Sequence, residues 1–157
     1  MELELPAPFT ARPYAGPADH AAMADALNDY YAHIGNPERT TLALFDNAYA
    51  NLVNCEPTRD IALIEDAAGE LAGYVRTWWE DLEDGTRDCI VFTPIRGRHA
   101  SSELFYSAIT GAEQHMQSWT RGPTARFVAF TIHPGPGAEL TGEPAWLESA
   151  GYATIRF

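Results

Sequence analysis

The chain has 157 residues, 46% of them hydrophobic, and a formal net charge of −12 at pH 7. This length suffices for one domain with a real core, and the acidic balance argues against a nucleic-acid partner, because phosphate backbones are bound by clustered Lys and Arg. Two cysteines fit a reducing, cytoplasmic compartment better than a disulfide framework. The first residues have no basic region and no long apolar stretch, so we expect no signal peptide and no membrane partner.

The first third of the chain is predicted to hold one strand and two helices. Residues 9–14 form the short strand. Gly16-Pro17 then opens a helix, since Pro suits the first helical position, and Gly35 ends it. A second helix is expected from about Thr41 to Val53, because its apolar residues recur at helical spacing.

The middle of the chain is predicted to form three antiparallel strands joined by short loops. They cover residues 61–65, 71–79 and 87–93. Turn residues at Asp66–Gly69 and Asp84-Gly85 separate them, which is typical of hairpins.

The last third is predicted to change topology. A helix capped by Ser101 or Ser102 leads to a strand at 125–132, a short helix at 144–150 and a last strand at 153–157. A helix between two strands at this length predicts a parallel crossover. The predicted fold class is therefore α/β: a single domain over residues 1–157 in the order β-α-α-β-β-β-α-β-α-β. Its mixed, mostly antiparallel central sheet carries helices on both faces.

The junction after the strand at 87–93 indicates a phosphate-binding geometry. The strand runs into a basic, Gly-containing turn, Pro94-Ile95-Arg96-Gly97-Arg98-His99-Ala100-Ser101-Ser102, and a helical pattern follows at once. Free backbone N–H groups and the positive end of a helix dipole both point at an anion in such a junction.

These features resemble the Gcn5-related N-acetyltransferase (GNAT) superfamily over nearly the whole chain. Pro94 to Arg98 match the family's lead-in to its cofactor loop, and Trp146 to Tyr152 match the junction before its last strands. The resemblance implies acetyl-CoA as co-substrate and direct acetyl transfer to a primary amine of a small molecule or peptide. No His/Cys spacing indicates a metal site. The cofactor-binding residues that the resemblance implies are Ile90, Phe92, Thr93, Arg96, Gly97, Arg98, His99, Ala100, Ser101 and Ser102.

Several positions depart from the family pattern. His99 and Ser101 replace the small loop residues that let a backbone approach phosphate, and Leu147 stands where the family often has a general-acid Tyr. The chain also ends at Phe157, where the family usually adds a seventh strand. We therefore expect a second copy of the chain or a downstream domain to cover the last strand. If no other segment covers it, we expect the domain to be C-terminally truncated. These departures keep an alternative open: a non-catalytic GNAT-like domain that binds a partner, forms half of a tandem or senses CoA.

Two residues are the candidates for removing the proton of the ammonium acceptor. Glu80 belongs to an acidic hairpin end, where a carboxylate can act through water. His133 follows the strand at 125–132, and ligands in open α/β sheets sit beyond the carboxyl ends of strands. The plainer alternatives are a solvated turn and a loop histidine without a role. Trp78 and Trp79 point to opposite faces of their strand, so one is expected in the core and the other in the wall of an acceptor cleft.

Overall fold

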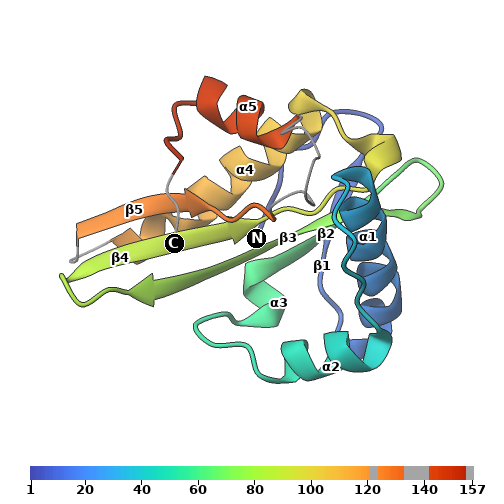
Figure 1. Ribbon diagram of the computed structural model, residues 1–157, viewed down its shortest axis with the longest axis horizontal. Helices are drawn as coiled ribbons and strands as arrows, with labels where there is room; N and C mark the ends of the chain where they lie inside the picture. Colours follow the sequence, from blue (N-terminus) through green and yellow to red (C-terminus); the bar gives the residue numbers. More distant parts are fainter. Residues whose placement is uncertain (121–123, 133–141, 155–157) are drawn as a thin grey trace.

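The computed structural model describes residues 1–120, 124–132 and 142–154, and its centre is a five-stranded sheet (Figure 1). The strands lie in the order of the chain: β1 (Thr10–Pro13), β2 (Ile61–Glu65), β3 (Leu71–Asp81), β4 (Thr86–Phe92) and β5 (Thr124–Ala129). The first four are antiparallel neighbours, and β5 pairs with β4 in parallel. The predicted α/β class and the parallel crossover are therefore confirmed.

Helices cover both faces of this sheet. The longest are α1 (His20–His33) and α4 (Ser102–Met116), and α4 makes the crossover between β4 and β5 (Figure 1). The helices α2 (Leu42–Ala50), α3 (Pro57–Asp60) and α5 (Glu143–Ser149) are shorter, and the 3₁₀ turns are η1 (Pro17–Asp19), η2 (Gly97–His99) and η3 (Gln117–Thr120). Within the described residues, no helix is long and apolar enough to cross a membrane.

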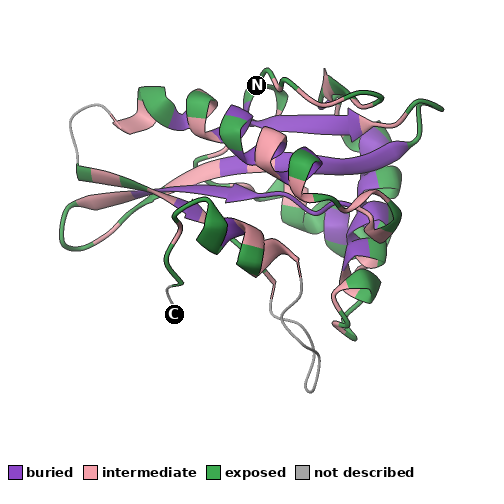
Figure 2. Ribbon diagram, turned by 90° about the horizontal axis from the view of Figure 1, so that it is seen from above, coloured by how far each residue is buried: buried purple, intermediate pink, exposed green. Residues whose placement is uncertain are grey.

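Alternation along the strands divides the core in two. Tyr74 and Phe92 pack against α1 and α2, whereas Val75 and Val91 pack against α4 and α5. Figure 2 shows buried residues along the strands and on the helix surfaces that face them, with exposed residues outside. Both faces of the sheet are thus covered around its middle.

Several element boundaries differ from the prediction, among them the end of β5, which lies at Ala129 rather than at residue 132. The second helix ends at Ala50 rather than near Val53, and a separate turn of helix, α3, begins with Pro57 at its first position. Strand β3 runs on to Asp81, because the acidic end of the hairpin still pairs with β4. Residues 153 and 154 are not in a strand, and the rest of the predicted last strand lies outside the described residues. The expectation that a partner covers that edge stays a prediction.

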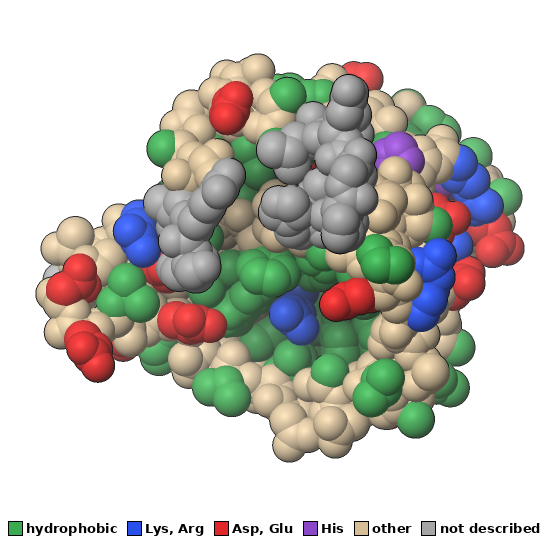
Figure 3. Space-filling view, in the orientation of Figure 1, with side chains coloured by type: hydrophobic (Ala, Val, Ile, Leu, Met, Phe, Trp, Pro, Cys, Tyr) green, Lys and Arg blue, Asp and Glu red, His purple; other side chains and the backbone are tan. Residues whose placement is uncertain are grey.

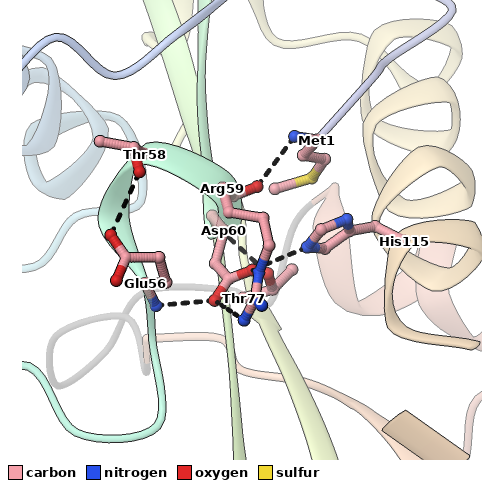
Figure 4. Close-up of polar contacts among 7 residues, drawn as sticks. All are labelled: Met1, Glu56, Thr58, Arg59, Asp60, Thr77 and His115. Atoms are coloured by element: carbon pink, nitrogen blue, oxygen red, sulfur yellow. Dashed lines mark hydrogen bonds and ion pairs between the residues drawn. The ribbon is translucent and has the colours of Figure 1, made fainter. Parts of the chain in front are cut away.

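A buried carboxylate, Asp60, joins α3 to α4 (Figure 4). Its oxygens accept hydrogen bonds from His115 Nε2 at 2.8 Å, from Arg59 Nε at 2.8 Å and from the N–H of Glu56 at 2.7 Å. The hydroxyl of Thr77 on β3 donates to the backbone oxygen of Asp60. Burial raises the pKa of Asp60, but these hydrogen bonds outweigh it and bring the pKa to about 2. The charge is therefore retained as part of the framework.

Candidate functional site

Strands β4 and β5 part at their carboxyl ends. They pair in parallel as far as Val91 and Ala129, and the N–H of Phe130 donates to the Val91 oxygen at 2.8 Å. Beyond that point the chain after β4 turns towards β3, where Ile95 forms a bridge with Gly73. The two neighbouring strands thus diverge, which leaves an edge of β4 without its parallel partner.

Gly73 makes this crossing of the backbone feasible. A Cβ atom at this position would lie 2.7 Å from the Pro94 oxygen and 3.0 Å from the Cα of Ile95. Both are backbone atoms that cannot rotate away, so the path of the loop after β4 depends on a residue of β3.

The loop ends in a capped helix that presents open N–H groups. The Ser101 hydroxyl accepts from the N–H of Leu104 at 3.3 Å and caps α4. The Ala100 N–H donates to the Gly97 oxygen within η2. Among the described residues, no partner is found for the N–H groups of Arg98, Ser101, Ser102 and Glu103. Such N–H groups and the helix dipole form a site for an anion.

Helix α1 holds the first half of this loop. Arg96 donates from Nη2 to Asp25 at 2.7 Å and from Nε to the Leu71 oxygen at 2.7 Å. The N–H of Gly97 donates to Asp29 at 2.8 Å. Arg96 and Gly97 are therefore engaged within the protein itself.

The second half of the loop faces the hairpin between β2 and β3. His99 Nε2 lies 3.3 Å from a carboxylate oxygen of Asp66, and the His99 ring packs edge-on against Phe9. Arg98 lies 3.8 Å from the same carboxylate oxygen, with 58% of its side chain exposed. Arg98 is thus the basic side chain of the loop with most freedom to reach a ligand.

Three of the predicted cofactor residues lie on the last part of β4 and just after it. Ile90 and Phe92 are buried on the face that α1 covers. Thr93 is buried too, and its hydroxyl has no hydrogen-bond partner within the described parts of the chain. An unpaired buried hydroxyl beside the open edge of β4 is available to a ligand.

A second carboxylate, the half-buried Glu143, lies near the same end of β4. It begins α5 and accepts a hydrogen bond from the Tyr30 hydroxyl at 2.7 Å. The Tyr30 ring packs edge-on against Phe92, and Phe92 packs against Phe130. Burial raises the pKa of Glu143 and the hydrogen bond from Tyr30 lowers it, which leaves the pKa at about 7. A carboxylate of this kind can take up and release a proton at neutral pH.

No family model matches the chain, and no curated protein matches it. Solved structures do match. A GCN5-related N-acetyltransferase from Sphaerobacter thermophilus is 19% identical with a TM-score of 0.60, over 74% of this chain and 35% of that one. The chain thus spans about a third of that protein.

Two further structures match over most of both chains. Glucosamine-6-phosphate N-acetyltransferase from Arabidopsis thaliana is 14% identical with a TM-score of 0.57, over 95% of this chain and 94% of that one. An acetyltransferase of the GNAT family from Bacillus anthracis is 10% identical with a TM-score of 0.60, over 96% and 82% of the two chains. This chain has the GNAT fold. The resemblance inferred from the loop and the helix junction is confirmed at the level of the fold.

Of the two predicted catalytic residues, only Glu80 lies in the part of the chain that the structure describes. Glu80 is exposed on β3, where it accepts from the indole N–H of Trp78 at 3.2 Å. Its neighbour Asp81 is paired with Arg87 at 2.6 Å. His133 lies outside the described residues. Glu80 and His133 therefore stay predictions.

Sequence reasoning did not single out Glu143. An acid at the start of a helix, here between Gly142 and Pro144, is an ordinary partner of the helix dipole. The signal that would have marked it is the contact with Tyr30, which is 113 residues away in the chain.

Neither thiol is suited to act as a nucleophile in this GNAT fold. Burial raises the pKa of Cys55 to about 11 and raises the pKa of the fully buried Cys89. Both therefore stay protonated at neutral pH, and the thiolate is the reactive form. No cluster of His, Cys, Asp and Glu that could hold a metal ion is found in the described part of the chain.

Proposed function

We propose that this protein is an N-acetyltransferase that moves the acetyl group of acetyl-CoA to a primary amine. The observation that carries the proposal is the start of α4, where open N–H groups lie just past the point at which β4 and β5 part. Pyrophosphate would be stabilised there by the N–H groups and by the helix dipole. The matching structures are named acetyltransferases, which supports the same activity here.

The described residues suit the two ends of this co-substrate. We assign the pyrophosphate to Arg98 and to the N–H groups of Ser101, Ser102 and Glu103. We assign the pantetheine arm to the end of β4 and the residue after it, from Ile90 to Thr93, where β5 leaves the edge open after Val91. Acetyl-CoA supplies the activated acetyl group.

Glu143 is the group that we assign to proton removal. An ammonium acceptor must lose a proton before its nitrogen can attack the acetyl carbonyl carbon, and a base with a pKa near 7 can take it. The carbon–sulfur bond then breaks, and CoA leaves as its thiol with the second proton of the amine. The protonated thiols of Cys55 and Cys89 favour this direct route over an acetylated cysteine.

Calorimetric titration of acetyl-CoA, together with thiol release in the presence of a panel of amines, tests the proposal. Arg98→Glu places a negative charge beside the pyrophosphate and should raise the dissociation constant at least about 10-fold. Arg39→Glu is the matched control, because Arg39 is exposed and, among the described residues, bonds only to backbone oxygens of its own loop. An Arg98→Glu variant that binds acetyl-CoA as the unchanged protein does would refute this placement.

A second candidate function, a non-catalytic domain, is favoured by the carboxylates around the loop. Asp25, Asp29 and Asp66 hold groups of a loop that a phosphate would otherwise engage. A domain of this kind would not bind acetyl-CoA even at millimolar concentration, whereas a sensor would bind it without releasing thiol. The same titration therefore separates the three functions.

Both cysteines are free, which supports a reducing compartment such as the cytoplasm.

A further inference from the structure

Among the residues that the structure describes, Arg76 on β3 has no counter-ion. Its guanidinium lies 4.6 Å from the ring centroid of Trp78 and 5.9 Å from that of Tyr49. Within the described residues it makes no hydrogen bond or ion pair, and its Nε is buried without a partner. A buried donor left unpaired is costly, so an Arg in this position indicates a missing acceptor.

The other arginines show how unusual this is. All ten basic residues of the chain are arginine, set against 22 acidic ones. The arginines that lie 2.6 to 2.8 Å from a carboxylate oxygen are Arg12, Arg59, Arg87, Arg96 and Arg126. Arg39 also lacks a carboxylate partner among the described residues, but it is exposed and donates to backbone oxygens. Arg76 differs because its buried Nε has neither kind of acceptor there, so it is positioned for an anion that comes from outside.

Arg76 lines a cavity of about 270 Å³ on the face of the sheet that α1 and α2 cover. Residues 51–53 and Cys55, between α2 and α3, form one wall, and Arg76, Trp78 and Glu80 form the other. In Figure 3 this side of the molecule is hollowed, and basic and acidic side chains lie among hydrophobic ones. The volume is just below the range of roughly 300–1,000 Å³ that holds drug-sized ligands, so the ligand is a small molecule.

This cavity lies one strand away from the proposed site of transfer. Arg76 is directly opposite Phe92 in the register of β3 and β4. Phe92 contacts the ring of Tyr30, whose hydroxyl binds Glu143. A molecule that reaches from Arg76 to the end of β4 would therefore bring its amine to the base. We propose that the acceptor amine also carries a carboxylate and that Arg76 binds this carboxylate; the proposal rests on the acetyltransferase function.

A carboxylate fits this cavity better than a phosphate does. A planar guanidinium matches a carboxylate through two parallel hydrogen bonds. A phosphate monoester carries a second negative charge, which Glu80 in the same wall would repel. The acceptor is accordingly a small amino acid with a separated amine and carboxylate.

Matched pairs of amines provide the test in the full chain. The ω-amino acids of three to six carbons are compared with the alkylamines of equal length and with phosphoethanolamine, and kcat/KM is measured by thiol release from acetyl-CoA. The amino acids should be preferred. Arg76→Met should lower their kcat/KM about 10- to 100-fold, as expected for the loss of a hydrogen bond to a charged group, and should leave the alkylamines nearly unchanged. Arg39→Met is the control and should change neither.

Binding of the N-acetylated ω-amino acids, measured by calorimetry without acetyl-CoA, separates this inference from the proposed function. Binding that Arg76→Met abolishes supports the carboxylate site even if no amine is acetylated. Equal rates for amino acids and alkylamines, unaffected by Arg76→Met, overturn the carboxylate site and leave the acetyltransferase standing. A preference for phosphoethanolamine that depends on Arg76 also overturns it. If Arg76→Met does not fold, Arg76→Lys keeps the charge and should show a partial loss for the amino acids alone.

Discussion

Two carboxylates show how the environment of a single residue sets its role. Burial raises the pKa of both Glu143 and Asp60. Asp60 accepts hydrogen bonds from the side chains of Arg59 and His115 and from a backbone N–H, which bring its pKa to about 2. Glu143 accepts one hydrogen bond, from the neutral hydroxyl of Tyr30, and its pKa stays at about 7. The first carboxylate is fixed in its charged form, and the second can exchange a proton at neutral pH.

The pH dependence of the proposed acetyl transfer should follow from Glu143. A base must be ionised, so kcat/KM of the unchanged protein should fall as the pH drops below about 7. Glu143→Gln should lower the rate by roughly 100-fold or more and remove this acid limb of the pH–rate profile. Tyr30→Phe removes the hydrogen bond that lowers the pKa of Glu143, so the limb should move to higher pH. If the fall of kcat/KM below pH 7 persists in Glu143→Gln but vanishes in Glu80→Gln, the base is Glu80, the residue predicted from the sequence.

At the scale of the elements, the loop after β4 depends on a glycine of β3. Gly73→Ala should destabilise the fold by about 2 kcal/mol, as overpacking does, because its Cβ meets the backbone of Pro94 and Ile95. Gly111→Ala is the matched control within α4. The closest atom to its Cβ would be the end of the flexible Leu3 side chain, and the nearest backbone atom, the Glu2 oxygen, would lie at 3.2 Å rather than at 2.7 Å as at Gly73. Ala also favours helix by about 1 kcal/mol over Gly. Urea unfolding of both variants gives the comparison. Equal midpoints would contradict this account of the crossing.

The elements themselves were largely predictable from the sequence. Strand β2 has the predicted bounds, and Ser101 caps the helix that forms the crossover. Apolar periodicity and turn residues are local signals, which is why they sufficed here. The short helix α3 was missed, although Pro57 marks its start.

The site was less predictable, because its contacts join residues that are distant in the chain. Arg96 pairs with Asp25 and Gly97 with Asp29, and each pair lies about 70 positions apart in the chain. No local sequence pattern predicts such contacts. The same is true of Tyr30 and Glu143. Arg76 carries no signal in the sequence, since only the structure shows that its Nε is buried without a partner in the described part of the chain.

For the molecule as a whole, stability should pass through a maximum near pH 4 to 5. Folding lowers the pKa of Asp60 to about 2, and it also lowers the pKa values of Asp19, Asp66, Asp81 and Asp84. Below about pH 4 the unfolded chain therefore binds more protons than the folded one, so stability falls as the pH drops. Folding raises the pKa of Glu143 from 4.5 to about 7, so stability also falls as the pH rises between these values.

Denaturant unfolding between pH 3 and 8 measures both slopes. Asp60→Asn should cost about 3 kcal/mol at pH 7, as the loss of one partner of a buried ion pair does, and should make the acid slope shallower. Glu143→Gln should remove the slope above pH 4.5. Glu83→Gln, an exposed acid of the β3–β4 hairpin, should change stability by less than about 0.5 kcal/mol. A stability curve that Glu143→Gln leaves unchanged would contradict the raised pKa.

Helix α1 gives the two halves of the proposed site a common support. Asp25 and Asp29 hold the loop to which we assign the pyrophosphate, and the next residue, Tyr30, holds Glu143. A ligand that shifts the loop must therefore act on the helix that positions the base. Occupancy of the two half-sites is then thermodynamically linked: CoA should change the affinity for the acceptor, and the acceptor should change the affinity for CoA by the same factor. Asp29→Asn should weaken this reciprocal effect while each ligand still binds alone, and titrations with and without the second ligand would measure it.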